Sequence, residues 1–175
     1  MRRFLSMTVL LVILGCNASH QSEPVTGTQS TAGDAITLSA DGIDLLGTSL
    51  NFPFTVSEIA KVIGPPDRVS RLANHVSTWD GFGLVVLEES PGDPIVEMDI
   101  CFHDEDELDF SPKHGFDGIV RYNSVDISSD SKRMDLVSAG FIQDEMLESL
   151  YRAEDGDLKM WAEYDNGLVE ITAAW

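Results

Sequence analysis

The sequence is poor in cysteine and in basic residues. Its 175 residues include two cysteines, Cys16 and Cys101, and 11 Lys and Arg against 30 Asp and Glu, a net charge of −19. One pair of cysteines cannot make the disulfide framework of a small secreted domain. Nucleic acid is excluded as a general partner, because binding to phosphates needs clusters of Lys and Arg. So acidic a chain suits a basic partner, although solubility alone also accounts for the charge.

Long hydrophobic runs are also scarce, and the one present lies at the N-terminus. Arg2 and Arg3 precede a largely apolar stretch from Phe4 to Leu14. Eleven residues make a helix of roughly 16 Å, about half of a bilayer's hydrocarbon thickness, so this run is too short to span a membrane. A basic start, a short apolar run and a small residue are typical of a signal peptide, which we place at residues 1–15.

The end of this run carries a short motif. Ile13, Leu14, Gly15 and Cys16 resemble the lipobox of bacterial lipoproteins. The resemblance implies cleavage before Cys16, its modification with acyl chains such as palmitate, and a membrane anchor. It also implies an outer-membrane location facing the periplasm, since Asn17 stands where an aspartate would retain the protein at the inner membrane. An ordinary signal peptide cut elsewhere is the alternative, because Leu14 is larger than is usual at its position.

The remaining chain divides into a tether and a folded part. Residues 16–35 are rich in Ser, Thr, Gly and Gln, which predicts a flexible tether after the lipidated cysteine. Residues 36–175 have the size of one domain, with halves at 36–116 and 117–175.

The first helix has the clearest local signal. Thr55 with Glu58 predicts a capping box, and Phe54 with Ile59 a hydrophobic staple. Gly64 ends this helix and two prolines follow it. Strands are expected at about 75–80, 83–89 and 95–102.

The second half repeats this order more faintly. A short helix closed by Gly140 precedes strands near 147–153, 158–164 and 168–174, with tight turns at Asp155-Gly156 and Asn166-Gly167. We therefore predict an α+β fold: an antiparallel sheet covered on one face by short helices, with two α-β-β pseudo-repeats in which Trp79 and Trp161 are equivalent.

One stretch supports this fold by resemblance. The residues "FTVSEIAKVIGPPDRV", followed by "VSTWDGFGLVVLE", resemble the helix, Gly-x-Pro and aromatic strand of small lipoproteins of the outer-membrane β-barrel assembly machinery, and of the β-lactamase-inhibitor-protein-like fold. Gly64, Pro66 and Trp79 match that pattern, whereas Asp80 and Gly81 depart from it. The resemblance covers residues 53–90 and implies a fold more than a function.

No catalytic motif is present, and the weaker sets of reactive residues match no established spacing. His103, His114, Asp104 and Asp106 can be drawn as a metal site, but a solvated acidic loop is the better interpretation, and we predict no metal and no cofactor. Ser111, His114 and Asp117 can be drawn as a hydrolase set, although such sets arise by chance among so many acids. We expect Cys101 to lie beside Glu97 and Asp99, opposite the apolar face of its strand, and to be inert. We read Trp79 and Trp161 as core or half-buried sheet residues.

The favoured function is non-catalytic binding of another protein by a membrane-anchored envelope accessory protein. The candidate partner-binding residues are five acids in six positions: Asp104, Glu105, Asp106, Glu107 and Asp109. An immunity or inhibitor protein against a basic toxin or enzyme is the alternative, and an unrecognised hydrolase is a third hypothesis. The first two hypotheses need a surface that binds a protein, whereas only the hydrolase needs a set of catalytic residues.

Overall fold

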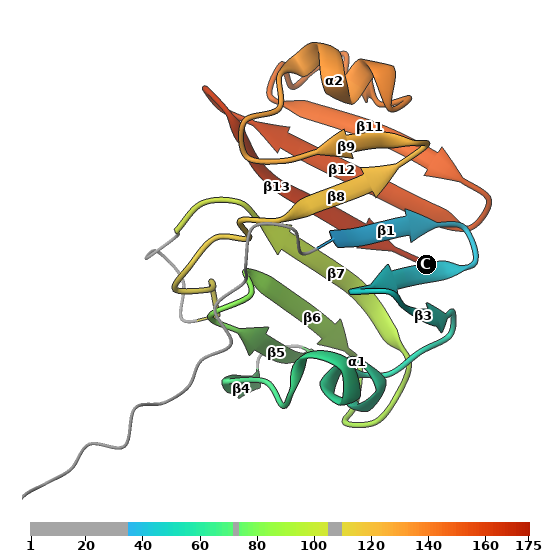
Figure 1. The fold of residues 1–175 in the computed structure, drawn as a ribbon, viewed down its shortest axis with the longest axis vertical. Coiled ribbons are helices and arrows are strands. Elements are labelled where there is room, and N and C mark those ends of the chain that lie inside the picture. The colour runs from blue at the N-terminus through green and yellow to red at the C-terminus, as the bar shows by residue number, and fades with distance from the viewer. Residues whose placement is uncertain (1–34, 72–73, 105–109) are drawn as a thin grey trace, which may run out of the picture.

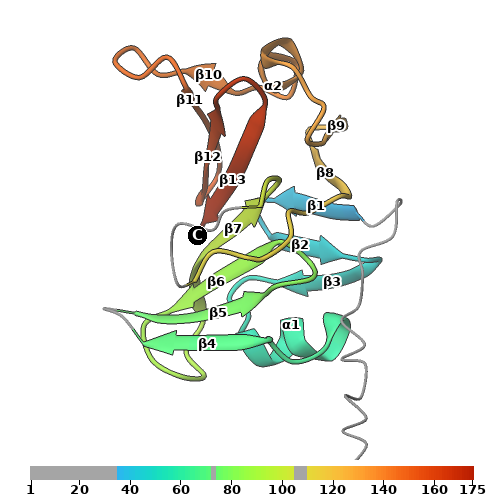
Figure 2. The ribbon, with the colours of Figure 1, turned by 90° about the vertical axis from the view of Figure 1, so that its left-hand side faces the viewer.

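The structure, a computed structural model, describes residues 35–71, 74–104 and 110–175. Within these residues the chain forms two β-sheets and two short helices. The sheets lie face to face as two layers (Figure 1), and the view in Figure 2 shows them edge-on. The predicted signal peptide, Cys16 and nearly all of the predicted tether lie outside the described residues.

The smaller sheet consists of five short strands that come from two separate stretches of the chain. Its spatial order is β3 (Thr48–Asn51), β2 (Gly42–Leu45), β1 (Ala35–Ser39), β8 (Ile119–Tyr122) and β9 (Val125–Ile127). β1 and β8 pair in parallel, and the other neighbours pair antiparallel. The parallel pair joins segments about eighty residues apart in the chain, so no local pattern announces it.

The larger sheet consists of two antiparallel runs of four strands that meet in its middle. Its spatial order is β10 (Ile142–Gln143), β11 (Leu150–Asp155), β12 (Leu158–Tyr164), β13 (Leu168–Ala174), β7 (Ile95–Cys101), β6 (Leu84–Glu88), β5 (His75–Trp79) and β4 (Arg68–Arg71). The junction is the antiparallel pair of β7 and β13, in which Ile100 is in register with Ile171. The last strand of each run therefore holds the two halves of the sheet together.

The two helices lie at opposite ends of the molecule (Figures 1 and 2). α1 (Val56–Ile63) begins after Thr55 and is followed by Gly64, as predicted, and it buries Ile59. α2 (Arg133–Ser138) buries Leu136 and contacts β9 of one sheet and β10 of the other. The helices thus close the ends of the two layers.

The hydrophobic core fills the space between the sheets. Alternation along the strands turns one set of side chains inward, as in β1, where Ile36 and Leu38 are buried. Fully buried side chains from both layers and both helices include Ile36, Leu45, Ile59, Leu84, Met98, Ile100, Ile127 and Leu136. Trp175 stacks on Phe52, with ring centroids 5.8 Å apart, which packs the last residue of the chain near the start of α1.

The predicted α+β class is wrong. The described residues form a mostly β, sandwich-like fold in which a second sheet, and not a layer of helices, covers the eight-stranded sheet. The sequence predicts no strand in residues 35–51 or 119–127, where the structure has five short strands of three to five residues each. Because those strands supply the second apolar layer, two short helices are enough to close the ends.

The predicted α-β-β repeat is wrong as well. Each helix is followed by four strands of the larger sheet, not two. Trp79 lies in the second strand after α1, whereas Trp161 lies in the third strand after α2, so the two tryptophans are not equivalent. Trp79 is buried and donates from Nε1 to the carbonyl oxygen of Gly64 at 2.8 Å, while Trp161 is half-buried on the outer face.

Candidate functional site

Residues 102–118 connect β7 to β8, and we call this connection the acidic loop; the structure describes 102–104 and 110–118 of it, and its two ends lie side by side. The Phe116 N–H donates to the carbonyl oxygen of Cys101 at 2.6 Å. Gly83 and Gly115 allow this close approach, because a Cβ at either position would collide with the facing backbone. The loop therefore leaves the sheet and returns to it at nearly one point.

This loop carries the acidic run that the sequence singled out. Of its five acids, Asp104 is described: its Oδ1 accepts the Gly115 N–H at 2.8 Å across the neck of the loop. Glu105, Asp106, Glu107 and Asp109 lie outside the described residues. The structure thus shows how the loop is attached on both sides of the run.

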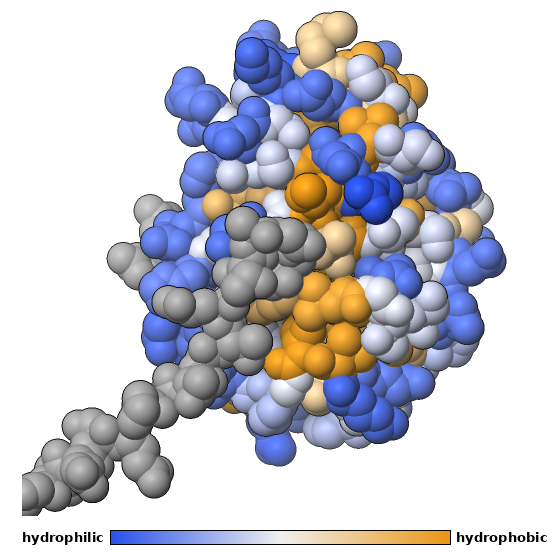
Figure 3. Space-filling model, in the orientation of Figure 1, coloured by the Kyte–Doolittle hydropathy of each residue, from blue (hydrophilic) through white to orange (hydrophobic). Residues whose placement is uncertain are grey.

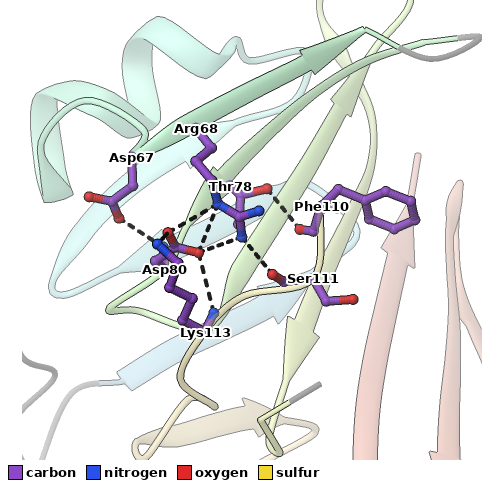
Figure 4. Close-up of polar contacts among 7 residues, drawn as sticks. All are labelled: Asp67, Arg68, Thr78, Asp80, Phe110, Ser111 and Lys113. Carbon is purple, nitrogen blue, oxygen red and sulfur yellow. Dashed lines mark hydrogen bonds and ion pairs between the residues drawn. The ribbon is translucent and has the colours of Figure 1, made fainter. Parts of the chain in front are cut away.

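The attachment centres on the carboxylate of Asp80, which follows β5 (Figure 4). Asp80 is buried; its two oxygens accept from Arg68 Nε at 3.1 and 3.0 Å, and Oδ1 also accepts from Arg68 Nη2. Lys113 of the loop adds an ion pair from Nζ at 3.1 Å and a backbone N–H bond at 3.3 Å. We call Asp67, Arg68, Thr78, Asp80 and Lys113 the loop mount.

Further bonds of the mount hold the loop backbone itself. Arg68 Nη2 donates to the carbonyl oxygen of Ser111 at 2.6 Å, and Thr78 Oγ1 donates to that of Phe110 at 2.9 Å. The His114 N–H donates to the carbonyl oxygen of Asp80 at 3.1 Å. Residues 110–114 are therefore fixed against β4 and β5 immediately after the acidic run.

The electrostatics of the mount favour an ionised Asp80. Burial by itself would raise the pKa of this carboxyl group, but the hydrogen bonds from Arg68 and Lys113 outweigh it and hold the pKa below its ordinary value. The Asp67 carboxylate accepts the Asp80 N–H at 2.8 Å and so fixes the turn after β5. A carboxylate engaged by two cations is a poor base or nucleophile, so the mount positions the loop and is not itself a reactive centre.

The chain was also compared with known proteins. A family model for a domain of unknown function, DUF7738, matches residues 35–136. The chain belongs to the DUF7738 family. The matched region runs from β1 into α2 and includes the loop mount and the acidic loop, whereas β10 to β13 lie beyond it. No curated protein and no solved structure matches the chain.

Within the DUF7738 region, a hollow of about 430 Å³ lies beside the neck of the loop. Its lining includes His103, Asp104, Asp117 and Ser129. It brings together two of the residues drawn above as a metal site, whereas His114 does not line it and Asp106 is not described. Among the described residues, no group of three or more His, Cys, Asp or Glu is placed to hold a metal ion.

The hydrolase set of Ser111, His114 and Asp117 is not assembled by hydrogen bonds within the described part of the chain. Ser111 is buried and bonds through its carbonyl oxygen to Arg68, while Asp117 lines the hollow beside His103. His114 is exposed and bonds to Asp80 through its backbone. The structure therefore gives this set no geometric support.

Cys101 lies on the face that the alternation predicted, beside Asp99 and opposite the core. It is buried because Val76 and Val85 pack with it and because Phe110 of the loop packs on this small cluster. Its Sγ lies 3.5 Å from Glu170 Oε2. The end of the acidic loop thus covers part of the outer face of the larger sheet.

A second surface stands out at the α2 end of the molecule. Among the described residues, large exposed apolar side chains gather on α2, β10 and the loop after β10: Met134, Val137, Ile142, Met146 and Leu147. The neighbouring hollow, of about 420 Å³, is lined by Asp144 and Glu145, and by Arg152, which pairs with Asp144. In the view of Figure 3, hydrophobic residues also form a band over the middle of the molecule, surrounded by hydrophilic ones.

Sequence reasoning missed the loop mount. Arg68 and Asp80 are twelve residues apart, and Asp80 and Lys113 are thirty-three apart, so no spacing motif links them. One signal was available: Asp80 follows four buried strand residues, and an acid at that place needs a cation nearby. The sequence does not tell which of its few basic residues supplies it.

Proposed function

We propose that this protein is a membrane-anchored, periplasm-facing envelope lipoprotein that binds a basic partner protein through its acidic loop, without catalysing a reaction. The observation that carries the proposal is the loop mount. Connections between neighbouring elements of a folded domain are usually much shorter than residues 102–118, and long ones often have a function. Here the buried carboxylate of Asp80, with Arg68 and Lys113, fixes residues 110–114, which directly follow the run of five acids.

Charge gives the class of partner. The acidic run concentrates five negative charges in six positions of a chain whose net charge is −19. Such a surface attracts a basic protein over about one Debye length, roughly 8 Å at physiological salt, and speeds encounter more than it slows dissociation. The exposed apolar side chains at the α2 end offer a second region of contact, because exposed apolar patches often mark protein-binding surfaces.

The anchor is part of the proposal and is tested separately. The lipobox-like residues ending in Cys16 support it. Neither helix of the described residues, α1 or α2, could span a membrane. Intact mass of the membrane-extracted protein should begin at Cys16 with about three acyl chains added. The Cys16→Ala variant should be lost from the mature membrane-bound pool. Recovery of the wild-type protein unmodified would contradict the anchor.

Crosslinking in intact cells tests the binding itself. The test variant replaces the five loop acids by their amides: Asp104→Asn, Glu105→Gln, Asp106→Asn, Glu107→Gln and Asp109→Asn. Asn at 104 keeps the side-chain oxygen that accepts from Gly115, so the neck of the loop is preserved. A matched variant removes five exposed acids outside the loop and outside the α2 end: Asp41, Glu89, Asp93, Asp157 and Glu163.

Binding by the loop predicts that one crosslinked partner is lost in the loop variant and kept in the matched variant. Equal loss of the crosslinked partner in both variants would mean that binding depends on the net charge of the protein and not on the loop. Retention in both would remove the loop from the proposal.

A further inference from the structure

A cluster of acidic and hydroxyl side chains lies on the outer face of the larger sheet, where β7 meets β13. Asp99 is in register with Thr172, and Cys101 with Glu170. These four side chains point away from the core. The residues that alternate with them are buried in the core: Met98, Ile100, Ile171 and Ala173.

The distances in this cluster fit two hydrogen bonds only if one of the two carboxyl groups carries a proton. Thr172 Oγ1 lies 2.8 Å from Asp99 Oδ1 and 3.0 Å from Glu170 Oε1. A hydroxyl group has one proton and donates it in one direction, and an ionised carboxylate only accepts. With both acids ionised, one of these two short O···O contacts would have no proton. A proton on one of the carboxyl groups completes both hydrogen bonds.

The other contacts of the cluster and its burial favour Asp99 as the holder of that proton. Glu170 Oε2 lies 3.5 Å from Cys101 Sγ, and because the thiol is the donor of this pair, the contact favours the ionised form of Glu170. Burial first, and then the neighbouring charge of Glu170, outweigh the lowering effect of the Thr172 hydroxyl and raise the pKa of Asp99 to about 7.

We propose that Asp99 is protonated in the folded protein and donates to Thr172, which donates to Glu170. This hydrogen-bond relay runs across the junction of the two four-stranded runs and opens when Asp99 loses its proton. The junction of the larger sheet is then sensitive to pH. The relay does not depend on the proposed function, because none of its three residues belongs to the acidic loop or to its mount.

The charged groups facing Asp99 from the described elements agree with this assignment. On its own strand, Glu97 adds a further negative charge that raises the pKa of Asp99. On β12, Glu163 is in register with Glu170, and Lys159, exposed, with Ala174. On the other side, β6 presents Val85 and Leu87, which do not ionise. The described surroundings of Asp99 are therefore more negative than positive.

Carboxyl carbon NMR shifts of the intact wild-type protein, followed from pH 4 to 9, test the relay directly. The Asp99 signal should titrate with a midpoint near 7, more than two pH units above an ordinary aspartate. Glu170→Gln removes the neighbouring charge and should lower this midpoint by at least one unit. A wild-type midpoint near 4, or a midpoint that ignores Glu170→Gln, would overturn the proposal.

Stability provides the second measurement. Between pH 4 and 7 the unfolded chain has released the Asp99 proton and the folded protein has not, so stability falls as pH rises and levels off above 7. The effect is at most tenfold per pH unit in the unfolding constant. Asp99→Asn keeps a donor for Thr172 and cannot ionise. It should therefore lose this part of the pH dependence and unfold at least tenfold less readily than wild type at pH 8.

Glu97→Gln is the matched control, since it removes one charge from the same face of the same strand, and it should keep most of the wild-type pH dependence. Parallel pH profiles of wild type and Asp99→Asn would contradict the relay. Failure of Asp99→Asn to fold at any pH would contradict it as well, because its amide reproduces the proposed donor.

Discussion

Asp80 shows how one residue determines the position of a whole loop. It is an acid that directly follows the buried residues of β5. Arg68 of the neighbouring strand β4 and Lys113 of the loop compensate its charge. Removing one charge of a buried ion pair leaves the remaining charge without an opposite charge nearby. The loss of stability is then larger than the net stabilisation that the intact pair provides. The mount should therefore be sensitive to substitution.

The Asp80→Ala variant should lose about 3 kcal/mol of unfolding free energy, measured by denaturant titration. Asp126→Asn is the control, because Asp126 pairs with Arg121 at 2.7 Å on the exposed surface, where solvent screens the pair, and its loss should move the denaturant midpoint less than the loss of Asp80. Equal losses in the two variants would show that the mount is no stronger than a surface ion pair.

The depressed pKa of Asp80 adds a pH dependence of the opposite sign to that of Asp99. Its ionised form is favoured in the folded protein, so its contribution is present at neutral pH and is lost as pH falls through the folded-state pKa, below 3.8. Amide exchange at residues 110–114 should therefore accelerate in acid before β12 and β13 open. Uniform exchange across both regions at low pH would count against a local role for Asp80.

At the scale of elements, the start of α1 depends on a single carboxylate. Glu58 Oε2 accepts the Thr55 N–H at 2.9 Å and the Thr55 hydroxyl at 3.0 Å. Glu58→Ala should therefore destabilise the protein by about 1 kcal/mol, at least as much as Thr55→Ala, and Glu58→Gln should recover part of the loss. Denaturant midpoints that move for Thr55→Ala alone would refute this order.

The elements that could be predicted from sequence are those with local signals. α1 has a capping residue at one end and Gly64-Pro65-Pro66 at the other, and it was found within one residue of both. Strands β5 to β7 and β12 to β13 are apolar and bounded by Gly or Pro turns, so they were found as well. β1 to β3 and β8 to β9 are short, and their pairing is long-range, so the second sheet was missed and the fold class with it.

The candidate site was predicted only in part for a similar reason. The acidic run is visible as consecutive letters, whereas its mount is assembled from three separate stretches of the chain. The relay at Asp99 and Thr172 depends on the pairing of β7 with β13, which no local pattern indicates. Four of the five loop acids and Cys16 lie outside the described residues, so their roles stay predictions.

At the scale of the whole molecule, the two layers make the halves of the chain interdependent. β1 pairs with β8, and β7 pairs with β13, so the boundary near residue 116 divides both sheets. A fragment of residues 35–136, the region matched by the DUF7738 model, keeps β6 but lacks β13, the other neighbour of β7, and should not fold by itself. Circular dichroism and amide spectra of this fragment should show an unfolded or aggregated chain, and a cooperative thermal transition would disprove this.

The proposed function rests on capture of a basic partner by the charge of the acidic loop. The most direct test is the association rate constant with the crosslinked partner, at about 20 and 150 mM salt, for wild type, the five-amide loop variant and the charge-matched surface variant. Capture by charge predicts that wild-type association slows severalfold between the two salt concentrations. It also predicts that the loop variant associates at least tenfold more slowly than the matched variant at low salt, while dissociation rates stay within about twofold of each other. Equal association rates for the two variants would contradict it.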